Sequence, residues 1–229
     1  MENLAAGIAH EIRNPLTTVK GFIQLIRPYL QEIDKVQYAD IALEEIDRAN
    51  GIIFEFLNAS KPQMATQLIR SINALVKDIA LLYESEAILR DIQIRSFLSL
   101  EDITIRMDAN QLKQVLINII KNSIEALDDV QQPQNERKID LITEINQEVA
   151  LIVIKDNGCG MTQETLDKLF LPFYTTKEKG TGIGLSVCKK IVEDSGGMIQ
   201  VESAPGAGTI FRLSFPSTMF IENAVRLNY

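Results

Sequence analysis

The chain contains a single histidine, His10, so any reaction at an imidazole must take place there. Apolar residues around it recur every three or four positions, as in an amphipathic helix; they are Leu4, Ile8, Ile12, Leu16, Val19, Ile23, Ile26 and Leu30. His10 follows Ile8 by two residues, about 200° around the helix at ~100° per residue, so its ring is predicted to face water. Asn14 lies one turn further along the same outer face, and Glu11 borders it.

The residues beside His10 favour a nucleophile over a solvated surface histidine, which is the other interpretation of a lone exposed ring. An acid such as Glu11 can hold one ring nitrogen protonated and leave the other lone pair free for attack. Pro15 lies inside the helical pattern, where it removes a backbone hydrogen bond and bends the helix, so that another body can approach. The residues from His10 to Thr17, His-Glu-Ile-Arg-Asn-Pro-Leu-Thr, resemble the H-box of bacterial sensor histidine kinases.

A second candidate site lies on the helix expected after Asp108. One side of this helix is apolar, and the other carries Gln114, Asn118, Asn122 and Glu125, where a solvated face would carry Lys and Glu. This polar side resembles the N-box of the histidine kinase ATP domain. The resemblance implies that Asn122 is a ligand of Mg²⁺, which prefers oxygen donors, and that Asn118 lies beside the phosphates. Glu125 stands where many relatives have lysine, and the only role assigned to it is to assist in binding the metal.

A third candidate lies at the end of a predicted strand, in Asp156-Asn157-Gly158-Cys159-Gly160-Met161. A buried carboxylate there can accept a hydrogen bond from an adenine amino group, and the two glycines let the backbone pass close to the base. The alternative is an Asp-Asn-Gly turn between two strands. The segment resembles the G1 box of the same ATP domain, which implies that Asp156, Gly158 and Gly160 bind the nucleotide. Cys159 is assigned to packing.

Two further motifs follow along the chain. Residues 170–177 resemble the F-box, and residues 180–185, Gly-Thr-Gly-Ile-Gly-Leu, resemble the G2 box, whose N–H groups suit phosphate oxygens at the start of a helix. The glycines do not sit in a βαβ unit, so a dinucleotide-binding fold is disfavoured. The candidate nucleotide ligands are Lys177, Lys179, Gly180, Gly182, Gly184, Leu185 and, near adenine in the last motif 206–209, Thr209. For the two lysines, a solvated side chain is the alternative.

Composition argues against several other classes of protein. The net charge of −8 and the pI near 4.8, with no block of Lys or Arg, disfavour a nucleic-acid surface. Cys159 and Cys188 have no metal-ligand spacing, and reduced thiols are expected. No run of about 18 apolar residues occurs, so no membrane span is predicted. Because no signal peptide precedes His10, we expect a cytoplasmic fragment whose sensor region, with or without a membrane anchor, lies upstream.

The first part of the chain is predicted to form two helices, Asn3–Arg27 and a second one ending near Ser60, joined by a loop at 31–35. The second helix has its own apolar stripe, at Ala39, Leu43, Ile46, Ala49, Ile53 and Phe56. Two such helices cannot bury both stripes alone, so a dimeric four-helix bundle is predicted. Lys61-Pro62 marks the domain boundary. The expected parts are 1–62 for dimerisation and histidine phosphotransfer, 63–216 for ATP binding, and 217–229 as a tail of unknown role.

The second part mixes helices and strands without βαβ alternation, so an α+β sandwich is favoured over a doubly wound sheet. Ser71 is expected to cap a helix ending at Leu89, and Asp108 a helix ending at Leu127. Another helix is expected at Gly184–Asp194. Strands are expected at Ile92–Leu98, Ile103–Met107, Ile139–Ile145, Val149–Asp156, Met198–Ser203 and Thr209–Phe215, the last four as two hairpins. The motifs resemble the ATP-binding domain shared by histidine kinases, Hsp90-type chaperones and gyrase.

The motifs follow one another in the order of the histidine kinase family, from Ile8 to Phe215. The resemblance implies an ATP- and Mg²⁺-dependent homodimer. In it, His10 takes the γ-phosphoryl group, with Glu11 as proton acceptor, and passes it to an aspartate of a response-regulator receiver domain. The resemblance also implies dephosphorylation of the regulator with help from Asn14, and a small inhibitor protein docking on the helical hairpin. The sequence resembles the sporulation sensor kinases of spore-forming bacilli. A phosphatase-dominant protein and a non-transferring ATP-binding scaffold are the alternatives.

Overall fold

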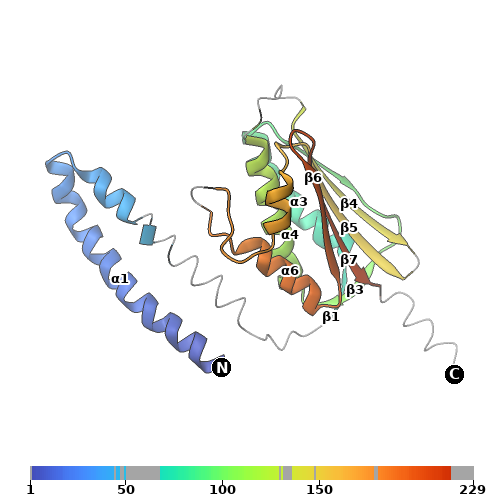
Figure 1. Cartoon of the computed structure of the whole chain (residues 1–229), viewed down its shortest axis with the longest axis horizontal. Helices are drawn as coiled ribbons and strands as arrows, with labels where there is room; N and C mark the ends of the chain where they lie inside the picture. The colour runs from blue at the N-terminus through green and yellow to red at the C-terminus, as the bar shows by residue number, and fades with distance from the viewer. Residues whose placement is uncertain are drawn as a thin grey trace.

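The computed structural model describes residues 2–43, 45–46, 49, 68–128, 130, 136–146, 148–177 and 180–217, and of residues 2–13 and 68–70 the backbone only. The described elements form a helical hairpin and a layered α/β part (Figure 1). The predicted boundary at Lys61-Pro62, the end of the predicted second helix and the tail from 218 lie outside the described residues. The division of the chain at 62 and 216 therefore stays a prediction.

Helix α1 (Glu2–Glu32) is longer than predicted, because it continues through Pro28. It ends instead at Glu32, and the chain turns at Asp34, whose φ of +55° is left-handed and lets the Lys35 N–H donate to the Leu30 carbonyl at 2.7 Å. This hydrogen bond spanning five residues is typical of a Schellman motif, a common helix end. A proline within a helix removes a single hydrogen bond, whereas a left-handed residue reverses the chain direction, so the turn decides where α1 stops.

The chain is helical again at 36–43, 45, 46 and 49, which completes the predicted hairpin. The Arg27 Nε donates to Asp40 Oδ1 at 2.8 Å and joins the two helices near the turn. Ala39 and Ile46 are buried, so part of the predicted second stripe is covered within one chain. None of the described helices combines the length and apolar character needed to cross a bilayer.

A five-stranded mixed sheet forms the centre of the α/β part. Its strands lie in the order β2 (Gln93–Phe97), β4 (Lys138–Asn146), β5 (Val149–Asp156), β7 (Gly208–Pro216) and β6 (Met198–Ala204). Strands β2 and β4 pair in parallel, and the other neighbours are antiparallel, including both predicted hairpins. A separate antiparallel pair joins β1 (Leu68–Ser71) to β3 (Thr104–Met107). The sequence does not predict β1, because four residues give too short a pattern.

Helices α3 (Ile72–Leu89), α4 (Ala109–Asp128) and α6 (Gly184–Asp194) cover one face of the sheet (Figure 1). A short helix, α5 (Gln163–Lys168), precedes α6 and is not predicted. The core lies between the helices and the sheet: Ala150, Ile152 and Ile154 of β5 are fully buried, whereas Lys155, on the opposite face of the strand, is exposed. The α+β sandwich predicted from the sequence is confirmed.

All three large helices begin where the sequence predicts, and α3 and α6 also end there. The Ser71 side chain accepts the Ala74 N–H at 3.2 Å and caps α3, which ends at Leu89 as predicted. Asp108 Oδ1 accepts the Asn110 N–H at 2.7 Å at the start of α4. These caps fix where the helices start, and therefore which side of α4 faces the sheet.

Candidate nucleotide site

Asp156 is the most buried carboxylate of the predicted site. It ends β5 opposite Thr209 of β7 and is 2% exposed. Its Oδ1 accepts the backbone N–H groups of Gly158 at 3.0 Å and Thr209 at 3.1 Å. Its Oδ2 accepts the Ser123 hydroxyl at 2.9 Å. Because a carboxylate oxygen has two lone pairs, Oδ2 can accept one more donor, such as an amino group of a base.

Burial raises the pKa of Asp156 above its ordinary value of 3.8, because the ionised form loses its water. The hydrogen bonds from Gly158, Ser123 and Thr209 lower the pKa and oppose this shift without cancelling it. The three donors explain how the charged form is held in a buried position. The corner therefore contains a negative acceptor, poor in water, at the end of a central strand.

The segment after Asp156 lies against α4 and against the turn between β6 and β7. At Gly158 a Cβ would lie 2.7 Å from the Ala126 carbonyl oxygen, so a larger residue would push the segment away from α4. The Cys159 N–H donates to that oxygen at 3.0 Å. Gly160 has a φ of +69°, which favours glycine. Gly158 is thus required by the close approach to α4 and Gly160 by its backbone conformation, and both lie just after Asp156.

The polar side of α4 contacts two places in the chain after α5: the start of α6 and the segment that precedes it. Asn118 Nδ2 donates to the carbonyl of Gly184, the first residue of α6, at 3.4 Å. One turn further on, Asn122 Oδ1 accepts the Lys177 ammonium at 2.7 Å, and the same ammonium contacts the Glu125 carboxylate. An amide oxygen and a carboxylate that already hold a cation are a donor set that suits Mg²⁺.

The glycine motif at 180–184 leads into α6, as predicted. Gly182 has a φ of +67°, and its carbonyl accepts the Phe173 N–H at 2.9 Å, which folds the segment back on itself. Among the described residues, no side chain caps the first turn of α6, whose N–H groups therefore suit an anion. Leu185 packs partly against the core, so its side chain serves packing. Lys179 lies outside the described residues.

The predicted phosphotransfer residues lie on α1. His10 and Glu11 fall where the structure describes the backbone only, and Asn14, one turn after His10, is exposed. The Thr18 hydroxyl donates to the Asn14 carbonyl at 3.1 Å. The roles of His10, Glu11 and Asn14 stay predictions.

Two serines contribute to the corner around Asp156 without being singled out by the sequence. Ser123 falls within the apolar side of α4 and is 1% exposed, yet its hydroxyl reaches Asp156. Ser203 Oγ accepts the Met161 N–H at 2.9 Å and donates to the Gly208 carbonyl at 2.8 Å. A hydroxyl inside an apolar stripe needs a buried partner, and this signal could have identified Ser123. Ser203, in an alternating strand, gives no comparable signal.

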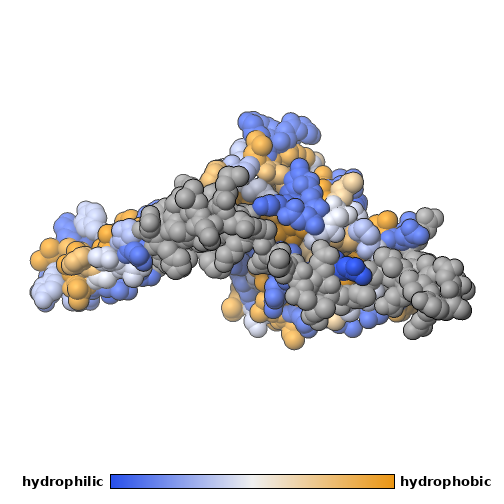
Figure 2. Space-filling model, turned by 90° about the horizontal axis from the view of Figure 1, so that it is seen from below, coloured by the Kyte–Doolittle hydropathy of each residue, from blue (hydrophilic) through white to orange (hydrophobic). Residues whose placement is uncertain are grey.

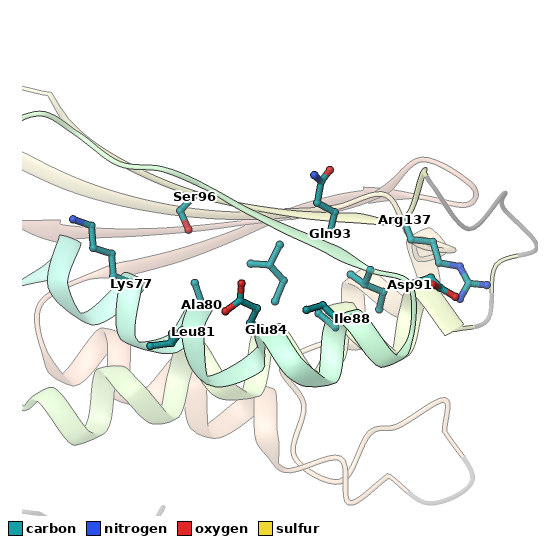
Figure 3. A pocket seen from close by; sticks show the side chains of 12 residues that line it. Lys77, Ala80, Leu81, Glu84, Ile88, Asp91, Gln93, Ser96 and Arg137 are labelled. Atoms are coloured by element: carbon teal, nitrogen blue, oxygen red, sulfur yellow. The ribbon is translucent and has the colours of Figure 1, made fainter.

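A cavity of about 700 Å³ lies elsewhere, between α3 and the edge strand β2 (Figure 3). None of the predicted site residues lines it; the lining is Lys77, Ala80, Leu81, Glu84, Ala87, Ile88, Asp91, Ile92, Gln93, Ile94, Ser96 and Arg137. The candidate nucleotide site is placed at Asp156 and not in this cavity, because Asp156 is a buried acceptor and its partner Ser123 lies on α4, the helix that also carries Asn122 and Glu125.

Two family models match the chain. Residues 107–219 match the histidine kinase-, DNA gyrase B- and HSP90-like ATPase family, and residues 1–65 match the His Kinase A (phospho-acceptor) domain. The chain belongs to the histidine kinase family. This confirms the family resemblance predicted from the sequence motifs.

Individual relatives agree with this assignment. Sporulation kinase C of Bacillus subtilis (strain 168) is 42% identical over 214 residues, which are 93% of this chain and 48% of that relative. Among solved structures, the catalytic domain of histidine kinase ThkA is 33% identical, with a TM-score of 0.57, over 65% of this chain and 94% of that one. ThkA in complex with response regulator protein TrrA is 31% identical, with a TM-score of 0.68, over 94% of this chain and 61% of that one. The chain thus spans about half the length of sporulation kinase C.

Proposed function

We propose that this chain is the catalytic core of an ATP-dependent protein-histidine kinase that phosphorylates itself on His10. The observation that carries the proposal is the buried Asp156, with one acceptor position still available, beside a helix whose Asn122 and Glu125 accept the Lys177 ammonium. An acceptor for adenine and a donor set for a phosphate-bound metal are the two parts that an ATP site needs. The test is transfer of label from γ-labelled ATP to His10.

The residues of the α/β part would bind and orient the nucleotide. Asp156 Oδ2 would accept the adenine amino group, with Thr209 beside it. Asn118, Lys177 and the N–H groups of 180–184 would face the phosphates. Asn122 would hold Mg²⁺, which when bound neutralises phosphate charge. Phosphoryl transfer demands mainly positioning and charge neutralisation, and these residues can supply both.

His10 would attack the γ-phosphorus through a ring nitrogen, forming an N–P bond as the bond to the leaving ADP oxygen breaks. Glu11, its neighbour in sequence, would take the proton from the other ring nitrogen. A non-transferring scaffold would need neither residue. The pair His10 and Glu11 therefore supports the kinase over that alternative.

Substitution of the proposed metal ligand should uncouple turnover from binding. Asn122→Ala is expected to lower Mg²⁺-dependent labelling by roughly 100-fold, the scale of a lost positioning contact. ATP affinity should change by less, because adenine is held at Asp156. Initial labelling rates and calorimetric titrations measure the two effects. Lys113→Ala, an exposed position on the same helix, is the control. Equal rates for Asn122→Ala and the control would remove Asn122 from the metal site.

Exposed apolar residues on the hairpin support the proposed homodimer. Figure 2 shows apolar side chains gathered on the surface of the hairpin, at the left of the view. They include Val19, Phe22, Leu25, Ile26, Tyr29, Ile33, Tyr38 and Ile41, each at least 46% exposed. Such a row on a single chain is best covered by a second hairpin, which would give the four-helix bundle.

Light scattering measures the assembly directly. The chain is expected to be a dimer at micromolar concentration, and Leu25→Glu should shift it towards monomer, because the change places a charge on the exposed apolar row. Gln24→Glu adds the same charge at a neighbouring exposed polar position and should leave the dimer intact. A parent chain that stays monomeric and helical would contradict the bundle.

A receiver domain of a response regulator is the proposed partner, because ThkA, a relative, forms a complex with response regulator protein TrrA.

Dephosphorylation of the regulator is a proposed second activity, since the exposed Asn14 amide could orient a water molecule one turn from His10. Asn14→Ala should then slow decay of the phospho-regulator by about 10–100-fold while labelling from ATP persists. Unchanged decay, with docking intact, would return Asn14 to a surface role. A small inhibitor docking on the hairpin, and anchoring of the whole protein in a membrane, stay predictions.

A further inference from the structure

The Lys177 ammonium joins two segments of the α/β part that are distant in sequence. The Lys177 ammonium donates to Asn122 and forms an ion pair with Glu125, which lie three residues apart on the polar side of α4. The backbone of Lys177 is held in a tight turn, because its N–H donates to Thr175 Oγ1 at 3.1 Å and its carbonyl accepts the Gly180 N–H at 3.2 Å. The ammonium therefore joins the segment before α6 to α4.

The oxygen that accepts this ammonium, Asn122 Oδ1, is the one assigned to Mg²⁺ under the proposed function. We propose that Lys177 is an exchangeable internal cation: in the nucleotide-free protein it occupies the oxygen that would hold the metal and latches residues 173–177 and 180–184 onto α4, and it would move to the phosphates when metal and nucleotide arrive. This inference rests on the proposed function of the site.

Electrostatics favours the exchange. Two cations at contact distance from one amide oxygen repel strongly, so a metal ion held by Asn122 would exclude the ammonium from that oxygen. The latch is also weak enough to open, because the side chains of Lys177 and Glu125 are 42% and 52% exposed and water screens their attraction. Lysine has a flexible stem and a compact charge, which lets the ammonium move between partners without a change of backbone. The phosphates of a bound nucleotide provide the alternative anion.

Two measurable properties follow from this exchange. Removing either charge of the latch should loosen residues 173–177 and 180–184 when no nucleotide is bound. Removing the Lys177 charge should also make nucleotide binding depend more strongly on Mg²⁺, because in the absence of metal the Lys177 ammonium would supply positive charge to the phosphates.

Amide hydrogen exchange of the nucleotide-free full chain tests the latch. Lys177→Gln and Glu125→Gln should each speed exchange of the Gly180 and Gly182 amides by about 2- to 5-fold, the range that a partly exposed ion pair supports. The double variant should be no faster than either single variant. Glu202→Gln, which removes a carboxylate from the exposed Arg212–Glu202 pair on β6 and β7, is the matched control. Unchanged exchange in both latch variants would overturn the proposal.

Titration with ATP in Mg²⁺ and in EDTA tests the exchange. The ratio of the Kd in EDTA to the Kd in Mg²⁺ should rise about 10-fold in Lys177→Gln, the scale of a lost charge-assisted hydrogen bond. Lys177→Arg, which keeps the charge, should bring the ratio of the two Kd values most of the way back to that of the parent chain. An unchanged ratio would overturn the exchange even if ATP binds and His10 is labelled. Absence of ATP binding in the parent chain would instead overturn the proposed function, so the two failures are distinguishable.

Discussion

Asp156→Asn is expected to bind ATP roughly 10–150-fold more weakly than the parent chain, the cost of losing a charge-assisted hydrogen bond. The geometry fixes how the new amide must sit. Oδ1 of Asp156 accepts two backbone N–H groups, from Gly158 and Thr209. The amide oxygen must take this position, so the NH₂ group replaces Oδ2. There it presents hydrogens to the adenine amino group, and a donor faces a donor. Calorimetric titration with ATP measures the loss.

The same substitution should leave the nucleotide-free fold at least as stable as the parent. Burial raises the pKa of Asp156, so the folded state binds its proton more tightly than the unfolded state. Between the unfolded value of 3.8 and the raised folded value, this group makes stability fall as pH rises. At neutral pH the ionised Asp156 therefore lowers the free energy of unfolding, and an amide removes that cost. The Ser123 hydroxyl can turn to accept from the new NH₂ group.

Acidification gives an independent test of the same carboxylate. As pH falls through the raised pKa, protonation removes the charged acceptor and the parent chain should lose ATP affinity. Asp156→Asn should not show this acid-side loss. Asp140→Asn is the matched control, because Asp140 is also buried but binds Arg95 in a bidentate pair on the sheet. If Asp156→Asn binds ATP as tightly as Asp140→Asn does, the base is bound elsewhere.

Much of the architecture could be predicted because local and tertiary preferences agree. Helix α6 was predicted with its observed ends, since a glycine motif precedes an amphipathic run and Gly196, with a φ of +73°, follows it. The two hairpins were predicted from alternating residues around short turns. In contrast, β1 could not be predicted, because its four residues form a strand only through pairing with β3. The predicted helix end at Pro28 is wrong. A proline costs one hydrogen bond but does not reverse the chain, so α1 continues through it.

Asp156 and Asn122 are predicted through motifs that resemble those of the family, since an acid before glycines also fits a turn and an asparagine on a helix is weak evidence alone. Their roles stay predictions; the structure shows that Asp156 is buried and that Asn122 accepts the Lys177 ammonium. Contacts between distant segments were not predictable. Lys177 lies 55 residues from Asn122 and 52 from Glu125, and no local pattern connects a lysine in a glycine-rich segment to a helix that far away. Ser123 lies within the apolar side of α4, and the identity of its partner, Asp156, 33 residues away, is visible only in the fold.

His10→Gln should abolish stable labelling from γ-labelled ATP, because no second histidine exists in the chain. ATP affinity should stay within about 2-fold of the parent, since the nucleotide ligands lie in the α/β part and sites without shared partners behave independently. Glutamine matches the polarity and approximate size of the imidazole, so the fold should be kept. Loss of ATP binding in His10→Gln would mean that the histidine serves the nucleotide site and not phosphoryl transfer.

The most direct test of the central claim is the chemistry and position of the phosphate on the parent chain. The chain is incubated with γ-labelled ATP and Mg²⁺, the label is challenged with acid and with alkali, and the labelled peptide is identified by mass spectrometry beside His10→Gln. The account predicts a label that is lost in acid, survives in alkali, maps to the peptide containing His10 and is absent from the variant. An acid-stable label, or an alkali-stable label that persists in His10→Gln, would contradict it.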